Sequence, residues 1–185
     1  MVGRGRDRRG DRREGRQQER ETFGRGGNAT KYQMREKLID IGDDFWIEND
    51  RGERAFKVDG KAVRVRNTLL LKDASGREVA KIQERVARVR DTLEIEGPDG
   101  STLATVHKAM VTPLRERFTV KVPGSEDLDV QGNIVDHEYE ISAGGTKVAE
   151  VSKRWFRVRD TYGVEVAPGQ DDGLILAITV GIDQL

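Results

Sequence analysis

The stretch ERAFKVDGKAVRVRNTLLLKDASGREVAKI, residues 53–82, contains one complete unit of a repeat. An alternating strand pattern leads to Val58, a basic segment follows, and a second strand pattern, TLLLKD, ends at the turn-forming letters DASG. Ile82 then occupies the position of Val58, 24 residues later. A fixed period of this length indicates a supersecondary unit that is repeated along the chain.

The same period extends in both directions from this stretch. Five equivalent apolar positions stand 24 residues apart, and a sixth unit begins near Val151 after a shorter step of 21 residues. The five positions are Met34, Val58, Ile82, Val106 and Val130. Segments rich in Gly, Asp, Asn and Ser separate the units in register with the period, namely NDRG, DASG, GPDG, PGSE and SAGG. Each unit is therefore expected to be a pair of strands joined to the next pair by a turn.

The strand patterns predict a closed antiparallel β-barrel. In TLEIE, residues 92–96, Leu93 and Ile95 alternate with Glu94 and Glu96, which is typical of antiparallel strands with one face in water. Six two-stranded units give about twelve strands in a meander. A sheet of that size is expected to curl and close, because closure removes its exposed edges.

The final stretch, GLILAITVGIDQL at residues 173–185, breaks the repeat. Its apolar residues cover every face of a helix, so the pattern predicts a helix buried on all sides, with Asp171 or Asp172 capping its start. A strand remains the alternative, because Ile and Val favour strands. A barrel of about twelve strands is too wide to be filled by its own side chains. A C-terminal helix inside it would fill that space, and Ala177 and Gly181 would let the helix approach the wall closely.

The charge distribution separates a basic tail from an acidic domain. Residues 1–31 hold ten Lys and Arg against five Asp and Glu, and their few apolar residues predict a disordered Arg/Gly-rich tail. Residues 32–185, with a net charge of −5, are expected to form the barrel domain. The tail is interpreted either as an arm that touches RNA or anionic lipid, or as a solvated segment. The acidic domain is a poor candidate for binding nucleic acid over a broad face.

The absence of cysteine excludes disulfides, thiolate metal sites and thiol nucleophiles. A cytoplasmic location is compatible with this composition, and the lack of an apolar run at the N-terminus predicts no signal peptide. The longest apolar run, residues 174–182, is far shorter than the roughly 20 residues that span a bilayer.

Three stretches resemble the LURP-one-related family of the tubby C-terminal-like superfamily. They are YQMREKLIDIGDDFWIEND at residues 32–50, the opening stretch at 53–82, and VSKRWFRVRDTYGVEVAPGQDDGLILAITVGID at 151–183. The resemblance covers roughly residues 32–185 and implies a twelve-stranded barrel around a central C-terminal helix. Its distant relatives include tubby domains, which bind phosphoinositides through basic residues, and membrane-associated scramblases with a palmitoylated cysteine tract. That tract has no counterpart here, and no tubby lipid-binding motif matches residue by residue.

The motif R-V-R-[DN]-T occurs three times in the sequence. Its copies span residues 64–68, 88–92 and 157–161. One interpretation is a structural corner in which the arginines pair with glutamates of neighbouring strands, at Glu94, Glu96 and Glu165. The other is that the repeat brings the arginines to one rim, where they bind phosphate or anionic head groups. The residues predicted to bind anionic lipid or phosphate are Arg64, Arg66, Arg88, Arg90, Lys153, Arg154, Arg157 and Arg159.

No catalytic motif and no metal-ligand spacing is present, so no catalytic residue, metal or cofactor is predicted. His107 and His137 are the only histidines and are interpreted as surface or structural residues. The sequence predicts a non-enzymatic barrel module, cytoplasmic or peripheral at a membrane, that binds anionic phospholipid or serves as an interaction scaffold. The alternative is a small-molecule binder or enzyme that uses the two histidines in a pocket at a barrel end.

Overall fold

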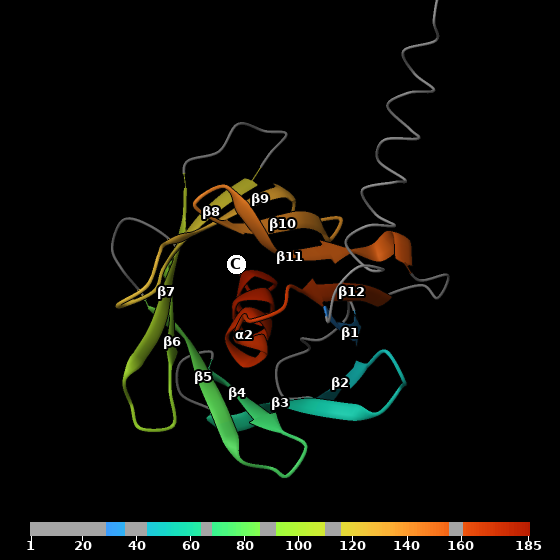
Figure 1. Cartoon of the computed structure of the whole chain (residues 1–185). Helices are drawn as coiled ribbons and strands as arrows, with labels where there is room; N and C mark the ends of the chain where they lie inside the picture. Colours follow the sequence, from blue (N-terminus) through green and yellow to red (C-terminus); the bar gives the residue numbers. More distant parts are fainter. Residues whose placement is uncertain (1–28, 36–43, 64–67, 86–91, 110–115, 156–160) are drawn as a thin grey trace, which may run out of the picture.

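A closed barrel of twelve antiparallel strands surrounds one helix in the computed structural model (Figure 1). The structure describes residues 29–35, 44–63, 68–85, 92–109, 116–155 and 161–185. The strands follow one another around the barrel in chain order, and β12 closes it against β1. Both the strand number and the closure predicted from the 24-residue period are confirmed.

The strands are short, with five to ten residues each. Their bounds are β1 Thr30–Arg35, β2 Phe45–Asn49, β3 Arg54–Val63, β4 Thr68–Asp73, β5 Glu78–Arg85, β6 Thr92–Glu96, β7 Thr102–Lys108, β8 Glu116–Lys121, β9 Leu128–Asn133, β10 Glu138–Ala143, β11 Thr146–Ser152 and β12 Thr161–Val166. A 3-10 turn, η1, spans Lys153–Trp155, and the helix α2 spans Asp172–Ile182. The prediction that residues 1–31 form a tail concerns a segment of which residues 1–28 lie outside the described part of the chain.

The repeat anchors form the inner wall of the barrel. All five side chains are at most 1% exposed, in the order Met34, Val58, Ile82, Val106 and Val130. The turns between units keep the same period, because Gly52, Gly76, Gly100 and Gly124 all adopt a φ between 75° and 84°. Glycine occupies that left-handed region without steric cost, so the repeated glycine fixes the repeated hairpin.

The helix α2 fills the interior as predicted. Nine of its eleven residues are buried, and the Asp171 side chain caps its start by accepting a hydrogen bond from the Leu174 N–H at 3.0 Å. A Cβ atom at Gly181 would lie 2.9 Å from Leu93 Cδ1, so the lack of a side chain there lets the helix touch β6. The strand alternative for this stretch is therefore wrong. Among the described residues, no helix is long and apolar enough to cross a membrane.

The meander gives the barrel two different ends. Tight turns join β2 to β3, β4 to β5, β6 to β7, β8 to β9 and β10 to β11 at one end, which we call the hairpin end. The strand ends that flank the R-V-R-[DN]-T segments lie at the opposite end, which we call the arginine end. The helix α2 starts at the hairpin end, after β12, and finishes beside His137 at the arginine end.

Candidate functional site

The strand ends that flank the three copies of R-V-R-[DN]-T lie at the arginine end of the barrel. The six arginines themselves lie outside the described residues. The flanking positions are described and are Val63 and Thr68, Arg85 and Thr92, and Trp155 and Thr161. Since alternate connections of an antiparallel meander share one end, all six flanking positions lie at the same end of the barrel. The threonine of each copy opens a strand, as predicted.

The glutamates that the sequence offers as partners for these arginines pair with other cations. Glu165 lies 2.6 Å from the Lys31 ammonium, measured from Oε1 to Nζ. Glu94 forms an ion pair with Arg85, and Glu96 with Lys81. Each of the three suggested glutamates therefore has a cationic partner outside the motif.

The two remaining predicted residues, Lys153 and Arg154, are described and lie on η1 at the arginine end. The Arg154 side chain is 62% exposed, and its Nε lies 3.4 Å from Glu138 Oε2. The Arg154 backbone N–H donates to Glu138 Oε1 at 3.2 Å. An exposed ion pair of this length contributes little to stability, about 0–1 kcal/mol, so Arg154 can exchange this partner for an external anion at small cost.

The arginine end also carries an exposed apolar side chain. Val135, in the connection between β9 and β10 at the arginine end, is 75% exposed. Among the described residues it is the only large hydrophobic side chain that is exposed. Sequence reasoning missed it because Val135 belongs to a short turn and does not continue the strand alternation.

The two ends of the barrel also differ in charge. The connections at the arginine end carry ten Lys and Arg against seven Asp and Glu, counted over residues 36–44, 64–67, 86–91, 109–115, 134–137 and 153–160. The connections at the hairpin end carry two Arg against six Asp and Glu, counted over residues 50–53, 74–77, 97–101, 122–127, 144–145 and 167–171. The barrel is therefore basic at one end and acidic at the other.

The two histidines do not form one site. His107 lies between the buried Val106 and the partly exposed Lys108 on β7, faces the outside of the barrel, and places Nδ1 3.4 Å from Thr92 Oγ1. His137 is buried at the arginine end and stacks on Tyr162, with ring centroids 4.2 Å apart. The described residues contain no group of three or more potential metal ligands.

His137 belongs to a buried polar cluster that closes the barrel beneath the end of α2. Its Nε2 lies 3.4 Å from Asp183 Oδ1, and the Tyr162 hydroxyl donates to the same carboxylate. Tyr139 is also buried here, and burial raises the pKa of its hydroxyl well above the usual value. His137 adopts a φ of 49°, which is uncommon for a residue with a side chain. The cluster joins residues far apart in sequence, so the sequence gives no signal for it.

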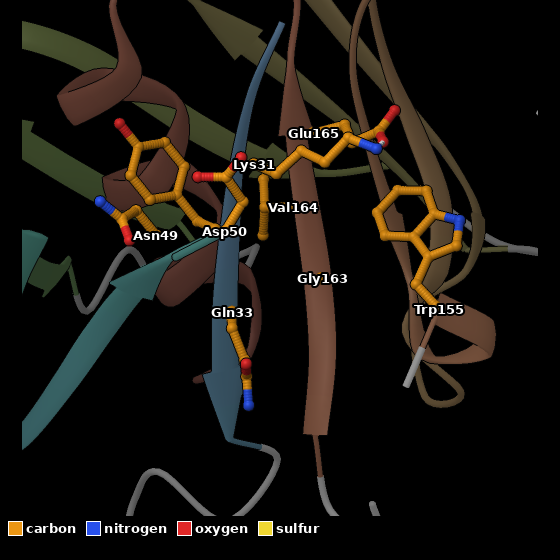
Figure 2. Close-up of a pocket in the computed structure, with 9 residues that line it drawn as sticks. Lys31, Gln33, Asn49, Asp50, Trp155, Gly163, Val164 and Glu165 are labelled. Carbon is orange, nitrogen blue, oxygen red and sulfur yellow. Dashed lines mark ion pairs between the residues drawn. The ribbon is translucent and has the colours of Figure 1, made fainter. Parts of the chain in front are cut away.

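A pocket of about 250 Å³ opens on the outer face of the barrel, over β1, β12, η1 and the end of β2. Figure 2 shows Lys31 reaching from β1 toward Glu165 on β12, with Trp155 on the other side of that strand. Gly163 lies between them and has no side chain to fill the space. This pocket is on the barrel wall and not at a barrel end, where the alternative function would have it, and neither histidine lines it.

Comparison with known proteins places the fold. The family model described as LURP-one-related matches residues 30–183. A protein from Arabidopsis thaliana, solved by X-ray crystallography, is similar in structure with a TM-score of 0.63. The two share 19% sequence identity over 84% of this chain and 90% of the other. At that identity the likeness concerns the fold alone. No curated protein matches the sequence.

Proposed function

Because this chain belongs to the LURP-one-related family, we propose that it is a non-enzymatic β-barrel module that binds anionic phospholipid head groups through its arginine end. Under this proposal the protein works in the cytoplasm and attaches peripherally to the membrane. The interaction needs no catalytic group and no cofactor, because the ligand is held by charge and is released unchanged.

One observation carries the proposal: the described strand ends beside the three R-V-R-[DN]-T copies lie at one end of the barrel, together with Lys153 and Arg154. A guanidinium group offers five donors in a plane and can hold two phosphate oxygens at once. Basic residues close to an anionic membrane each contribute about 1 kcal/mol to binding. Several of them on one rim therefore give a useful affinity even when each contact is weak.

Val135 supports the orientation of this interaction. Peripheral membrane proteins combine electrostatic attraction with the insertion of apolar side chains into the interface. The exposed Val135 side chain is at the basic end, where it would be available for insertion into the interface if that end faced the lipid. The acidic hairpin end would be repelled by the same surface and would point away from it.

The test is vesicle co-sedimentation of the full chain. We expect sedimentation with phosphatidylserine vesicles at low salt and its loss at high salt, since the attraction between exposed charges is screened. Replacing the six R-V-R-[DN]-T arginines by glutamine should abolish binding. The matched control replaces Arg51 and Arg77, at the hairpin end, by glutamine and should bind like the parent protein.

The basic tail is the same in the parent and in both variants, so the comparison separates the barrel from the tail. Equal sedimentation of the parent and the six-arginine variant would contradict the proposal and would favour the tail as the lipid-binding segment. Equal binding to neutral phosphatidylcholine vesicles would also contradict it, because charge would then play no part.

A further inference from the structure

The outer pocket combines a flat aromatic wall with a buried carboxylate. Trp155 of η1 provides the wall, and Glu165 of β12 provides the carboxylate, whose side chain is only 5% exposed. Gly163 of β12 faces outward beside Gln33 of β1 and has no side chain, so the floor at Gly163 is bare backbone. The space therefore suits a thin, planar group that lies on the strand and stacks against an indole (Figure 2).

The charge of the lining favours a cation. Glu165 and Asp50 supply two carboxylates, and Lys31 supplies one ammonium group. Lys31 already donates to Glu165, which shows that this buried carboxylate attracts a cation. A carboxylate has two oxygens and several lone pairs, so it can accept a second donor beside Lys31. A planar cation with several donors is the guanidinium group.

The other tryptophan of the same barrel already forms this kind of contact. Arg54 places its guanidinium carbon 4.7 Å from the ring centroid of Trp46. Within the described part of the chain, no cation lies over the ring of Trp155. A guanidinium group over Trp155 would repeat the contact between Arg54 and Trp46, with a carboxylate as an additional partner.

The nearest source of guanidinium groups is the chain itself. Residues 1–28 contain nine arginines and lead directly into β1, whose Lys31 forms one edge of the pocket. A fully extended chain from Arg25 to Lys31 spans up to roughly 20 Å. Tethering also gives the tail arginines an effective concentration in the millimolar range, enough to fill a weak site.

We propose that the pocket formed by Lys31, Gly163, Glu165 and Trp155 binds a guanidinium group, and that an arginine of residues 1–28 occupies it. This inference is independent of lipid binding, because the pocket lies on the barrel wall and shares none of the six R-V-R-[DN]-T arginines. The same guanidinium chemistry in solution or on another protein could fill the site, and the test separates these sources.

The experiment uses the full chain with Trp46→Phe, which leaves Trp155 as the only tryptophan. Two tail variants replace the nine arginines by glutamine or by lysine. Quenching of Trp155 fluorescence by neutral acrylamide reports how far the indole is covered. We expect stronger quenching in both tail variants than in the parent, with the larger increase in the glutamine variant.

Argininamide then serves as a free probe. It should saturate the glutamine variant at millimolar concentration and protect Trp155, whereas lysinamide should bind about two- to fivefold more weakly. The parent should need more argininamide, because its own tail competes. Glu165→Gln should weaken argininamide binding, and so should Asp50→Asn, which changes an exposed residue and leaves the fold intact. Glu126→Gln, an exposed acid outside the pocket, should not.

Three results would overturn the inference. If argininamide does not saturate any variant, the pocket is not a guanidinium site. If argininamide binds the parent and the glutamine variant equally well, the tail is not the occupant. If lysinamide matches argininamide, the site selects positive charge alone and not the planar group.

Discussion

Asp73 shows how a single side chain fixes a turn of this barrel. At the end of β4 its Oδ1 accepts hydrogen bonds from the Ser75 hydroxyl at 2.6 Å, the Ser75 N–H at 2.8 Å and the Arg77 N–H at 3.0 Å. Asn49, one repeat earlier, accepts from the N–H groups of Arg51 and Glu53 in the same way. The repeat therefore conserves the turn chemistry as well as the apolar anchors.

These bonds predict an unusual titration of Asp73. The Ser75 hydroxyl, and then the Arg77 and Ser75 backbone donors, lower the pKa of Asp73 from 3.8 to about 2. A depressed pKa means that the carboxylate's contribution to stability is present above pH 3.8 and is lost as the pH falls through about 2. Carboxyl NMR titration should give a midpoint near 2, and Ser75→Ala should move it upward. A midpoint at the ordinary value in the parent protein would contradict this account.

The Tyr162 hydroxyl should contribute to stability at the arginine end. It donates to Asp183, and removing it leaves a buried carboxylate without one of its donors. Tyr162→Phe is expected to lower the free energy of unfolding by about 1–3 kcal/mol, measured by urea denaturation.

Tyr139→Phe is the matched control for this substitution. The Tyr139 hydroxyl is buried but makes no hydrogen bond within the described residues, and the nearby Thr179 hydroxyl donates to the Ile175 carbonyl instead. Its removal should be neutral or slightly stabilising. Equal losses for the two phenylalanine variants would show that packing, and not the hydrogen bond to Asp183, stabilises this end.

At the scale of the elements, Gly132 controls how β9 meets β10. Its φ is 150°, and a Cβ atom there would lie 2.4 Å from the Glu138 carbonyl oxygen and 2.6 Å from Tyr139 Cα. Because these are backbone atoms of the paired strand, the clash cannot be relieved by a side-chain rotation. Gly132→Ala should cost about 3 kcal/mol or more in thermal or urea unfolding.

Gly76→Ala provides the comparison for Gly132→Ala. Gly76 also has a positive φ, of 84°, but a Cβ atom there would meet nothing within 4 Å. Gly76→Ala should therefore lower the free energy of unfolding only by the backbone strain, about 1–2 kcal/mol. Similar losses of stability for the two variants would mean that the close contact between β9 and β10 at Gly132 adds nothing to the backbone strain.

Variants at the start of α2 test whether the Asp171 cap stabilises the helix. Asp171→Ala removes the side chain that accepts from the Leu174 N–H and should cost about 1 kcal/mol, whereas Asp171→Asn keeps an acceptor and should cost less. Urea denaturation of both variants measures the difference. If the alanine and asparagine variants unfold alike, the cap does not hold the helix.

The elements themselves could be predicted because their causes are local. Alternation reveals the strands, glycine reveals the turns, and the all-round apolar pattern of residues 174–182 reveals the helix. The ion pairs could not be predicted, since they depend on the strand register, which places Gln83 opposite Glu94 and lets Arg85, two residues further along β5, form the ion pair with Glu94. The outer pocket requires β12 to place Gly163 beside Gln33 and η1 to bring Trp155 over it.

At the scale of the whole molecule, the barrel separates its charges. The antiparallel meander places alternate connections at opposite ends of the barrel. Because the sequence has arginines in one set of connections and acidic residues in the other, one end is basic and the other is acidic. Neither the composition nor the net charge of zero reveals this arrangement. It appears only when the connections are assigned to their ends, which explains why the three R-V-R-[DN]-T segments look scattered in sequence.

We propose that the arginine end faces an anionic membrane, and fluorescence from a single environment-sensitive probe tests this claim. The chain has no cysteine, so Val135→Cys at the arginine end and Ala74→Cys at the hairpin end each give one labelling site. With phosphatidylserine vesicles, we expect the emission of a probe at position 135 to rise and shift to the blue, while a probe at position 74 stays unchanged. A response at position 74, or none at either position, would contradict the claim.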